Sequence, residues 1–341
     1  MPSPKPLSVI FGCAGLELSD AERAFFREVE PLGFILFQRN CDSKPQVKKL
    51  VAELRACVGH ADAPVLIDQE GGRVARLKPP HWPAFPPAKA YADLFANDSQ
   101  AGLEAARLGG RLIAHELAEL DITVDCAPVL DVPQPGADPI IGDRAFGPDA
   151  ATIATVAHAF MDGLKAGGVS AVIKHVPGHG RALVDSHKDL PRVDASREDL
   201  QAIDFAPFRA LNMASWAMTA HVVYEALDAA QPATTSAPVI EDVIRRHIGF
   251  RGVLLSDDLS MKALSGDFAQ RARACLDAGC DVALHCNGDM GEMVEVARGA
   301  FPMTRASWAR YKMSELHRAS ATRLKFNAKQ ARKRFDELLG A

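Results

Sequence analysis

Several features are missing from this chain, and their absence excludes whole classes of protein. No apolar run reaches the 18 or more residues of a membrane-spanning helix. The seven cysteines are scattered and include no Cys-x-x-Cys pair, which is typical of buried thiols in a reducing compartment and not of a disulfide framework. The formal net charge of -4 gives no general attraction to nucleic acid or to anionic lipid. We therefore expect a neutral or locally recognised substrate, with neither nucleic acid nor a membrane as partner.

Two further absences narrow the candidates among enzymes. No Gly-x-Gly-x-x-Gly turn follows the first apolar run, which disfavours a dinucleotide-binding fold. Aromatic residues make up only 6% of the chain, which argues against a long polysaccharide groove lined by stacked rings. Trp82 lies in a proline-rich stretch and is a candidate for stacking on a sugar, whereas Trp216 is expected inside a strand.

Short apolar runs recur along the chain and are separated by longer amphipathic stretches. Helix-start signals open two of these stretches, at residues 19–22 and 196–199. Alternation of short apolar strands with helices predicts a parallel sheet covered by helices, and eight such units favour a closed (β/α)8 TIM barrel. The expected strands are residues 8–12, 33–37, 65–68, 124–129, 171–175, 216–221, 253–257 and 282–286.

The length of 341 residues with 48% hydrophobic side chains suits one α/β barrel domain. Residues from about 303 to 341 are expected as appended helices packed on the barrel. The basic stretch 323–334 is interpreted as a solvated helix face, with a nucleic-acid arm as the alternative. Lys5 and the apolar run 7–16 around Cys13 loosely resemble an export or lipidation signal, but the run is short, contains glycines and is expected to form the first strand.

Polar residues gather where the predicted strands end, which is where barrels of this kind hold their catalytic groups. Asp257 ends one strand, and residues 174–189 follow another with three histidines, His175, His179 and His187. A metal site is one interpretation, although ligands from one glycine-rich loop would be poorly fixed. Acid/base catalysis by His187, oriented by Asp185, is the second. Ordinary hydrogen-bonding loop residues are the third.

Five segments in order resemble the family 3 glycoside hydrolases, and within them the bacterial single-domain β-N-acetylglucosaminidases of peptidoglycan recycling. Each segment alone is weak evidence, but the five together are highly specific and span nearly the whole chain. They are residues 67–76, 127–132, 141–146, 174–187 and 251–261.

The resemblance implies a retaining mechanism with named catalytic residues. Asp257 would be the nucleophile that forms a glycosyl-enzyme, and His187 the acid/base with Asp185 as its partner. Because neighbouring strand residues alternate faces, Asp258 is expected to be structural, as a cap for the following helix. Glu70 is the rival carboxylic acid, but the glycines after it favour a loop-shaping role.

The resemblance also implies a set of sugar-binding residues that combine carboxylates with planar or cationic donors. An alternative interpretation of the same residues is a salt-bridge network that stabilises the barrel rim. No cofactor and no metal are expected. The implied binding residues are Asp68, Arg76, Arg144, Lys174 and His175.

The implied activity is release of terminal N-acetyl-β-D-glucosamine from small glycans. The implied substrate is a muropeptide or related cell-wall fragment with N-acetylglucosamine β-1,4-linked to anhydro-N-acetylmuramic acid, processed in a bacterial cytoplasm by a monomer. Two other functions remain open: a phosphorylase, in which phosphate resolves the intermediate, and a sugar-binding barrel that has lost its chemistry.

Overall fold

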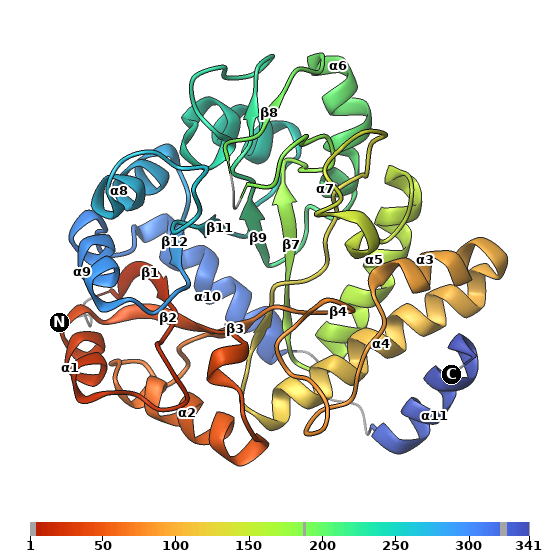
Figure 1. Ribbon diagram of the computed structural model, residues 1–341, viewed down its shortest axis with the longest axis horizontal. Helices are drawn as coiled ribbons and strands as arrows, with labels where there is room; N and C mark the ends of the chain where they lie inside the picture. The colour runs from red at the N-terminus through yellow and green to blue at the C-terminus, as the bar shows by residue number, and fades with distance from the viewer. Residues whose placement is uncertain (1–4, 187–188, 321–325, 341) are drawn as a thin grey trace.

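The predicted strands close into one parallel barrel. The computed structural model describes residues 5–186, 189–320 and 326–340, and its barrel strands follow the order β1-β12-β11-β9-β7-β6-β3-β2 (Figure 1). This confirms the predicted (β/α)8 architecture. The strands are β1 Leu7–Phe11, β2 Pro31–Leu36, β3 Val65–Ile67, β6 Val124–Asp125, β7 Ser170–Val176, β9 Trp216–Thr219, β11 Val253–Asp258 and β12 Val282–His285.

One predicted strand is much shorter than expected. Residues 124–129 were expected as a strand, but β6 ends at Asp125. Pro128 has no N–H to donate to a neighbouring strand. The chain nevertheless stays paired with β7 beyond Asp125, because the Ala127 and Pro128 carbonyls accept from the Val172 and Lys174 N–H groups, and the Leu130 N–H donates to the Lys174 carbonyl.

Helices surround the barrel, and their N-termini carry the predicted caps. The Ser19 and Glu22 side chains each accept a hydrogen bond from the other residue's backbone N–H, and the Ser196 hydroxyl accepts one from the Asp199 N–H. Both helix-start predictions are confirmed. The helices are α1 Asp20–Val29, α2 Lys44–Ala56, α3 Ala88–Asn97, α4 Ser99–Glu119, α5 Ala150–Ala166, α6 Arg197–Asp199, α7 Ala206–Ala210, α8 Phe268–Ala278, α9 Met290–Gly299, α10 Arg305–Ala319 and α11 Ala328–Leu339.

Shorter strands and turns lie in the loops that follow the barrel strands. The antiparallel pair β4 Gln69–Gly71 and β5 Val74–Ala75 follows β3, and the parallel pair β8 Arg192–Val193 and β10 Val223–Tyr224 joins the loops after β7 and β9. Tight turns lie at η1 Gln38–Asn40, η2 Gly142–Arg144 and η4 Ala233–Thr235, and wider π-type turns at η3 Leu200–Asp204 and η5 Val239–His247.

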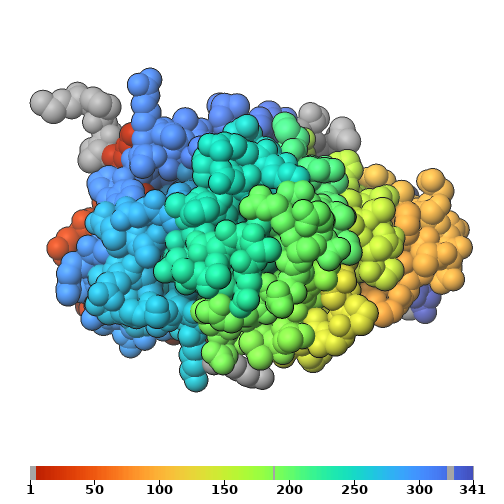
Figure 2. Space-filling view, turned by 90° about the horizontal axis from the view of Figure 1, so that it is seen from above, coloured from red at the N-terminus to blue at the C-terminus, as the bar shows by residue number. Residues whose placement is uncertain are grey.

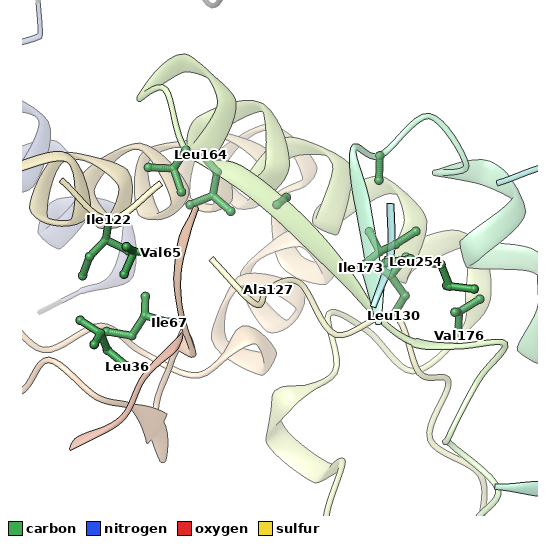
Figure 3. Close-up of a cluster of buried hydrophobic side chains, with 14 of the residues drawn as sticks. Leu36, Val65, Ile67, Ile122, Ala127, Leu130, Leu164, Ile173, Val176 and Leu254 are labelled. Carbon is green, nitrogen blue, oxygen red and sulfur yellow. The ribbon is translucent and has the colours of Figure 1, made fainter. Parts of the chain in front are cut away.

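Alternate residues of the strands divide the core into two sets. Ile35 and Leu66 belong to a cluster inside the barrel, while Leu36, Val65 and Ile67 belong to the larger cluster between strands and helices. Figure 3 shows part of this outer cluster, with Val65 and Ile67 on the same side as Leu36. Burial on both faces explains why the strands read as unbroken apolar runs.

The two C-terminal helices pack at different places, α10 against strand β11 and α11 against helix α4. Trp216 is fully buried and its indole N–H donates to the Ser314 hydroxyl of α10 at 2.6 Å, which confirms its place in the core. Helix α11 lies against α4, where Arg334 pairs with Glu104. Part of the basic stretch 323–334 therefore lies on a helix, as its interpretation as a helix face requires. Figures 1 and 2 show that α3 and α4 extend the molecule at one end.

The cysteines form no disulfide in the described residues. All seven cysteines lie in the described ranges, where each is a free thiol and six are buried. Within these ranges no helix combines the length and apolar character needed to cross a membrane.

Candidate active site

A cavity of about 260 Å³ opens at the C-terminal ends of the barrel strands. Six predicted site residues line it together, although they come from separate segments of the chain. Asp185 is half-buried and directly precedes Ser186, which also lines the cavity. His187 lies outside the described residues. The six residues are Asp68, Arg76, Arg144, Lys174, His175 and Asp257.

Two carboxylates and three cations form a network on one side of the cavity. The Lys174 ammonium lies 2.9 Å from Asp68 Oδ1 and 2.7 Å from Glu70 Oε1. Arg76 Nη2 donates to Asp68 Oδ2 at 2.8 Å, and Arg144 binds both Glu70 oxygens at 2.8 and 2.9 Å. The ion-paired residues border the cavity itself. The same side chains could therefore stabilise the barrel rim and contact a sugar.

This network holds Glu70 in its ionised form. Burial alone would raise the pKa of Glu70, but Lys174 and Arg144 outweigh it and lower the pKa to about 2. The same balance, set by Lys174 and Arg76, holds the pKa of Asp68 well below its usual value. A carboxylate that keeps its charge at neutral pH is a poor general acid, so the geometry disfavours Glu70 as the rival acid.

The two neighbouring acids at the end of β11 differ in their contacts. Asp258 accepts hydrogen bonds from the Ser260 N–H and hydroxyl at 3.0 and 2.6 Å and from the Cys286 N–H at 3.2 Å. It also lines the cavity, and the predicted helix cap is wrong, because α8 begins ten residues later and Asp267 caps it. Asp257 lines the cavity and accepts a hydrogen bond from the Asp258 N–H at 2.8 Å.

A buried carboxylate orients the histidine that follows Lys174. Asp131 is completely buried, and its Oδ2 lies 2.7 Å from His175 Nδ1. Its Oδ1 accepts from the backbone N–H of His179 at 2.6 Å. No role for Asp131 was predicted from the sequence, although it lies in the 127–132 segment of the family resemblance and closely follows a barrel strand.

His179 also lines the cavity but is electrically neutral. Burial lowers the pKa of His179 to about 4, against the opposing charge of Asp131. His179 packs its ring at 5.8 Å from the His175 ring. It therefore adds a neutral polar surface to the cavity.

Two further residues were not predicted from the sequence. The ring of Phe37 lines the cavity and lies 4.7 Å below the Arg76 guanidinium. His221, fully buried just after β9, places Nε2 3.0 Å from the Asp258 carbonyl and Nδ1 2.7 Å from the Thr234 hydroxyl. A polar residue at the end of a predicted strand was the available signal for His221.

Neither a metal nor a tryptophan platform is apparent in the described part of the site. Trp82 is only 4% exposed and belongs to the hydrophobic core, so the prediction of a stacking surface there is wrong. Within residues 5–186, 189–320 and 326–340, no group of three or more His, Cys, Asp or Glu residues is arranged to hold a metal ion.

Comparison with known proteins shows the family to which the chain belongs. The glycosyl hydrolase family 3 N-terminal domain model matches residues 13–309. A β-hexosaminidase of Xanthomonas axonopodis pv. citri is 40% identical over 298 residues, covering 85% of this chain and 87% of that protein. Native NagZ of Neisseria gonorrhoeae superposes with a TM-score of 0.87 at 32% identity, over 99% of both chains. NagZ in complex with N-trifluoroacetyl-D-glucosamine gives the same TM-score and identity, covering 99% of this chain and 100% of that chain. The chain therefore belongs to glycosyl hydrolase family 3 and is a glycoside hydrolase.

Proposed function

We propose that this enzyme is a retaining exo-β-N-acetylglucosaminidase with Asp257 as its nucleophile. The observation that carries the proposal is the position of Asp257 on the cavity wall, together with Asp68, Lys174 and Arg144. A similar β-hexosaminidase and the complex of NagZ with an N-acetylglucosamine analogue support the choice of sugar.

In the proposed reaction, Asp257 attacks the anomeric carbon while an acid protonates the leaving oxygen. The resulting glycosyl-enzyme is hydrolysed by water, with net retention of configuration. Asp68 and Glu70 are unsuited to the acid role because cations hold both in the ionised form. The resemblance to family 3 glycoside hydrolases supports His187 as the acid/base and Asp185 as its partner. The imidazolium would give its proton to the leaving oxygen and become neutral, so it would add no second negative charge to the site.

The network residues would bind the hydroxyls of the terminal sugar. The Asp68 carboxylate has acceptor capacity beyond its two ion-pair contacts, and the cations Arg76, Arg144 and Lys174 supply donors. His175 borders the same cavity. Because the ion pairs fix these groups before substrate arrives, binding would require little reorganisation.

The size of the cavity favours removal of one sugar at a time. Its volume of about 260 Å³ lies below the roughly 300–1,000 Å³ of pockets that enclose drug-sized ligands. One terminal N-acetylglucosamine would fill the cavity, and the rest of the substrate would remain at the mouth. The proposed substrate is N-acetylglucosaminyl-β-1,4-anhydro-N-acetylmuramic acid, with or without peptide.

The proposal extends to the setting of the reaction. We expect a monomer whose one barrel domain, with helices α10 and α11, carries the whole activity on muropeptides in a bacterial cytoplasm. Gel filtration with light scattering tests the oligomeric state, and digestion of purified anhydro-muropeptides, followed by mass spectrometry of the products, tests the substrate.

A chromogenic N-acetyl-β-D-glucosaminide, assayed beside the matching β-glucoside in phosphate-free buffer, tests the reaction. We expect selective cleavage of the first substrate, loss of activity in Asp257→Ala and strong reduction in His187→Ala. Asp242→Ala, at an exposed ion pair with Arg246, is the matched control and should retain activity. Turnover that needs phosphate would indicate a phosphorylase, and sugar binding without turnover would indicate a binding protein.

A further inference from the structure

Asp131 joins two parts of the site through one buried carboxylate. It lies in the loop after β6 and is completely buried. Oδ2 lies 2.7 Å from the His175 ring Nδ1, and Oδ1 accepts from the backbone N–H groups of His175 and His179 at 3.2 and 2.6 Å. These hydrogen bonds and the adjacent His175 outweigh the effect of burial and lower the pKa of Asp131, so the group is an acceptor at neutral pH.

We propose that Asp131 is a positioning residue that fixes the tautomer of His175 and so sets how this histidine meets the substrate. The proposal rests on the proposed function, in which His175 binds the sugar. An ionised carboxylate only accepts hydrogen bonds, so Nδ1 of His175 must carry a proton. When the ring is neutral, Nε2 is then an acceptor for a sugar hydroxyl.

The same carboxylate anchors the loop that leads toward Asp185. Besides the His179 contact, the backbone N–H groups of Gln134 and Asp138 donate to the carbonyls of Gly180 and Ala182 at 3.0 and 2.8 Å. Gly180 lies very close to the loop after β6. A β-carbon on residue 180 would come within 2.0 Å of the Val132 carbonyl oxygen. Residues 179–182 are therefore held against residues 131–138, and Asp131 links that contact to His175.

Asp125 provides a matched comparison at the end of β6. It is also completely buried, and the hydrogen bond found for it is accepted from the Gln69 N–H at 2.9 Å. Burial raises the pKa of Asp125 to about 7, so an amide resembles its protonated form. Asp125→Asn thus makes the same chemical change beside the same strand without a contact to His175.

The test variant is Asp131→Asn, which keeps the shape of the side chain. If the amide oxygen stays with the two backbone N–H groups, the amide NH2 faces His175 Nδ1 and the ring proton must move to Nε2. The opposite amide orientation would place its NH2 against two N–H donors, which is less favourable. We therefore expect Asp131→Asn to preserve the loop contacts and to reverse the tautomer of His175.

Kinetics with the chromogenic N-acetylglucosaminide measure how the reversed tautomer of His175 affects catalysis. We expect Asp131→Asn to lower kcat/KM by about 10- to 100-fold, mainly through KM, by analogy with carboxylates that orient metal-bound histidines. Asp125→Asn should stay within about twofold of the wild type. In a His175→Ala background, Asp131→Asn should change kcat/KM by less than about twofold, because the group it acts through is gone. An undiminished effect in that background would overturn the proposal.

A spectroscopic measurement tests the proposal without catalysis. Nitrogen NMR of the ¹⁵N-histidine-labelled wild type, with His175 assigned by its loss in His175→Gln, should show a proton on Nδ1. A proton on Nε2 alone would overturn the proposal, even if Asp131→Asn failed to fold. If the wild type cleaved no N-acetylglucosaminide, the proposed function would fail, while the tautomer measurement would still decide the role of Asp131.

Discussion

Lys174 and Glu70 meet beside the cavity with 2.7 Å between Nζ and Oε1, and both side chains are almost completely buried. Lys174 also contacts Asp68, and Glu70 also binds Arg144. Each charge is therefore matched where water is largely excluded, and the loss of any one member leaves a buried charge with too few partners.

Glu70→Gln should destabilise the protein strongly. The amide keeps the size of the side chain but leaves Lys174 and Arg144 without one of their counter-charges. Breaking a buried ion pair from one side typically costs about 3 to 5 kcal/mol, and we expect a decrease of that order in the free energy of unfolding in urea at pH 7. Asp242→Asn, at an exposed ion pair, should change it by less than about 1 kcal/mol. Equal effects would show that the buried network adds no special stability.

The contribution of Glu70 should disappear in acid. Its pKa falls from 4.5 to about 2 on folding, so the folded protein binds the proton less tightly than the unfolded chain. The stabilisation is therefore complete above about pH 4.5 and is lost as the pH falls toward about 2. The difference in unfolding free energy between wild type and Glu70→Gln should shrink over this window. A difference that stayed constant would contradict the pKa.

The strand ends were predictable, but the partners of their side chains were not. Asp257 and the segment that begins at Lys174 were singled out because barrel strands place polar residues at one end, whereas Asp68 was named through the resemblance to family 3 glycoside hydrolases. The partner of Glu70 is Arg144, 74 residues away and on a short turn. Asp131 similarly meets His175 across 44 residues. Such contacts between loops follow no periodicity, so the sequence alone could not pair them.

Helix caps could also be predicted only in part, even though a cap and its helix are close in sequence. Ser19 and Ser196 were recognised because the capping residue and its helix are adjacent. Asp258 was given a cap role on the same reasoning, but a turn intervenes and its carboxylate instead binds Ser260 and the Cys286 N–H. The distance from strand end to helix start is set by how the loop packs over the barrel, which the local sequence does not encode.

Asp125→Asn should weaken the dependence of the free energy of unfolding on pH between about pH 3.8 and pH 7. Burial raises the pKa of Asp125 from 3.8 to about 7, so the folded protein holds this proton more tightly than the unfolded chain. The favourable contribution is complete below about pH 3.8 and is lost as the pH rises through about 7. Asp125→Asn cannot ionise, so its unfolding free energy should rise relative to the wild type between these values. Chemical unfolding at pH 4, 6 and 8 measures the trend, and parallel profiles would contradict it.

His221→Gln should lower kcat more than it changes KM. His221 Nε2 lies 3.0 Å from the backbone carbonyl of Asp258, next to the proposed nucleophile Asp257, and Thr234 holds the other ring nitrogen. Burial lowers the pKa of His221, which favours a neutral ring that donates from Nε2 and accepts at Nδ1. Glutamine cannot span both partners, so the end of β11 should shift. Small displacements of a reacting group can cost up to about 100-fold in rate, and we expect a decrease in kcat of at least about tenfold. His158→Gln, at an exposed histidine of α5, is the control. A decrease confined to KM would show that His221 supports substrate binding and not the placement of Asp257.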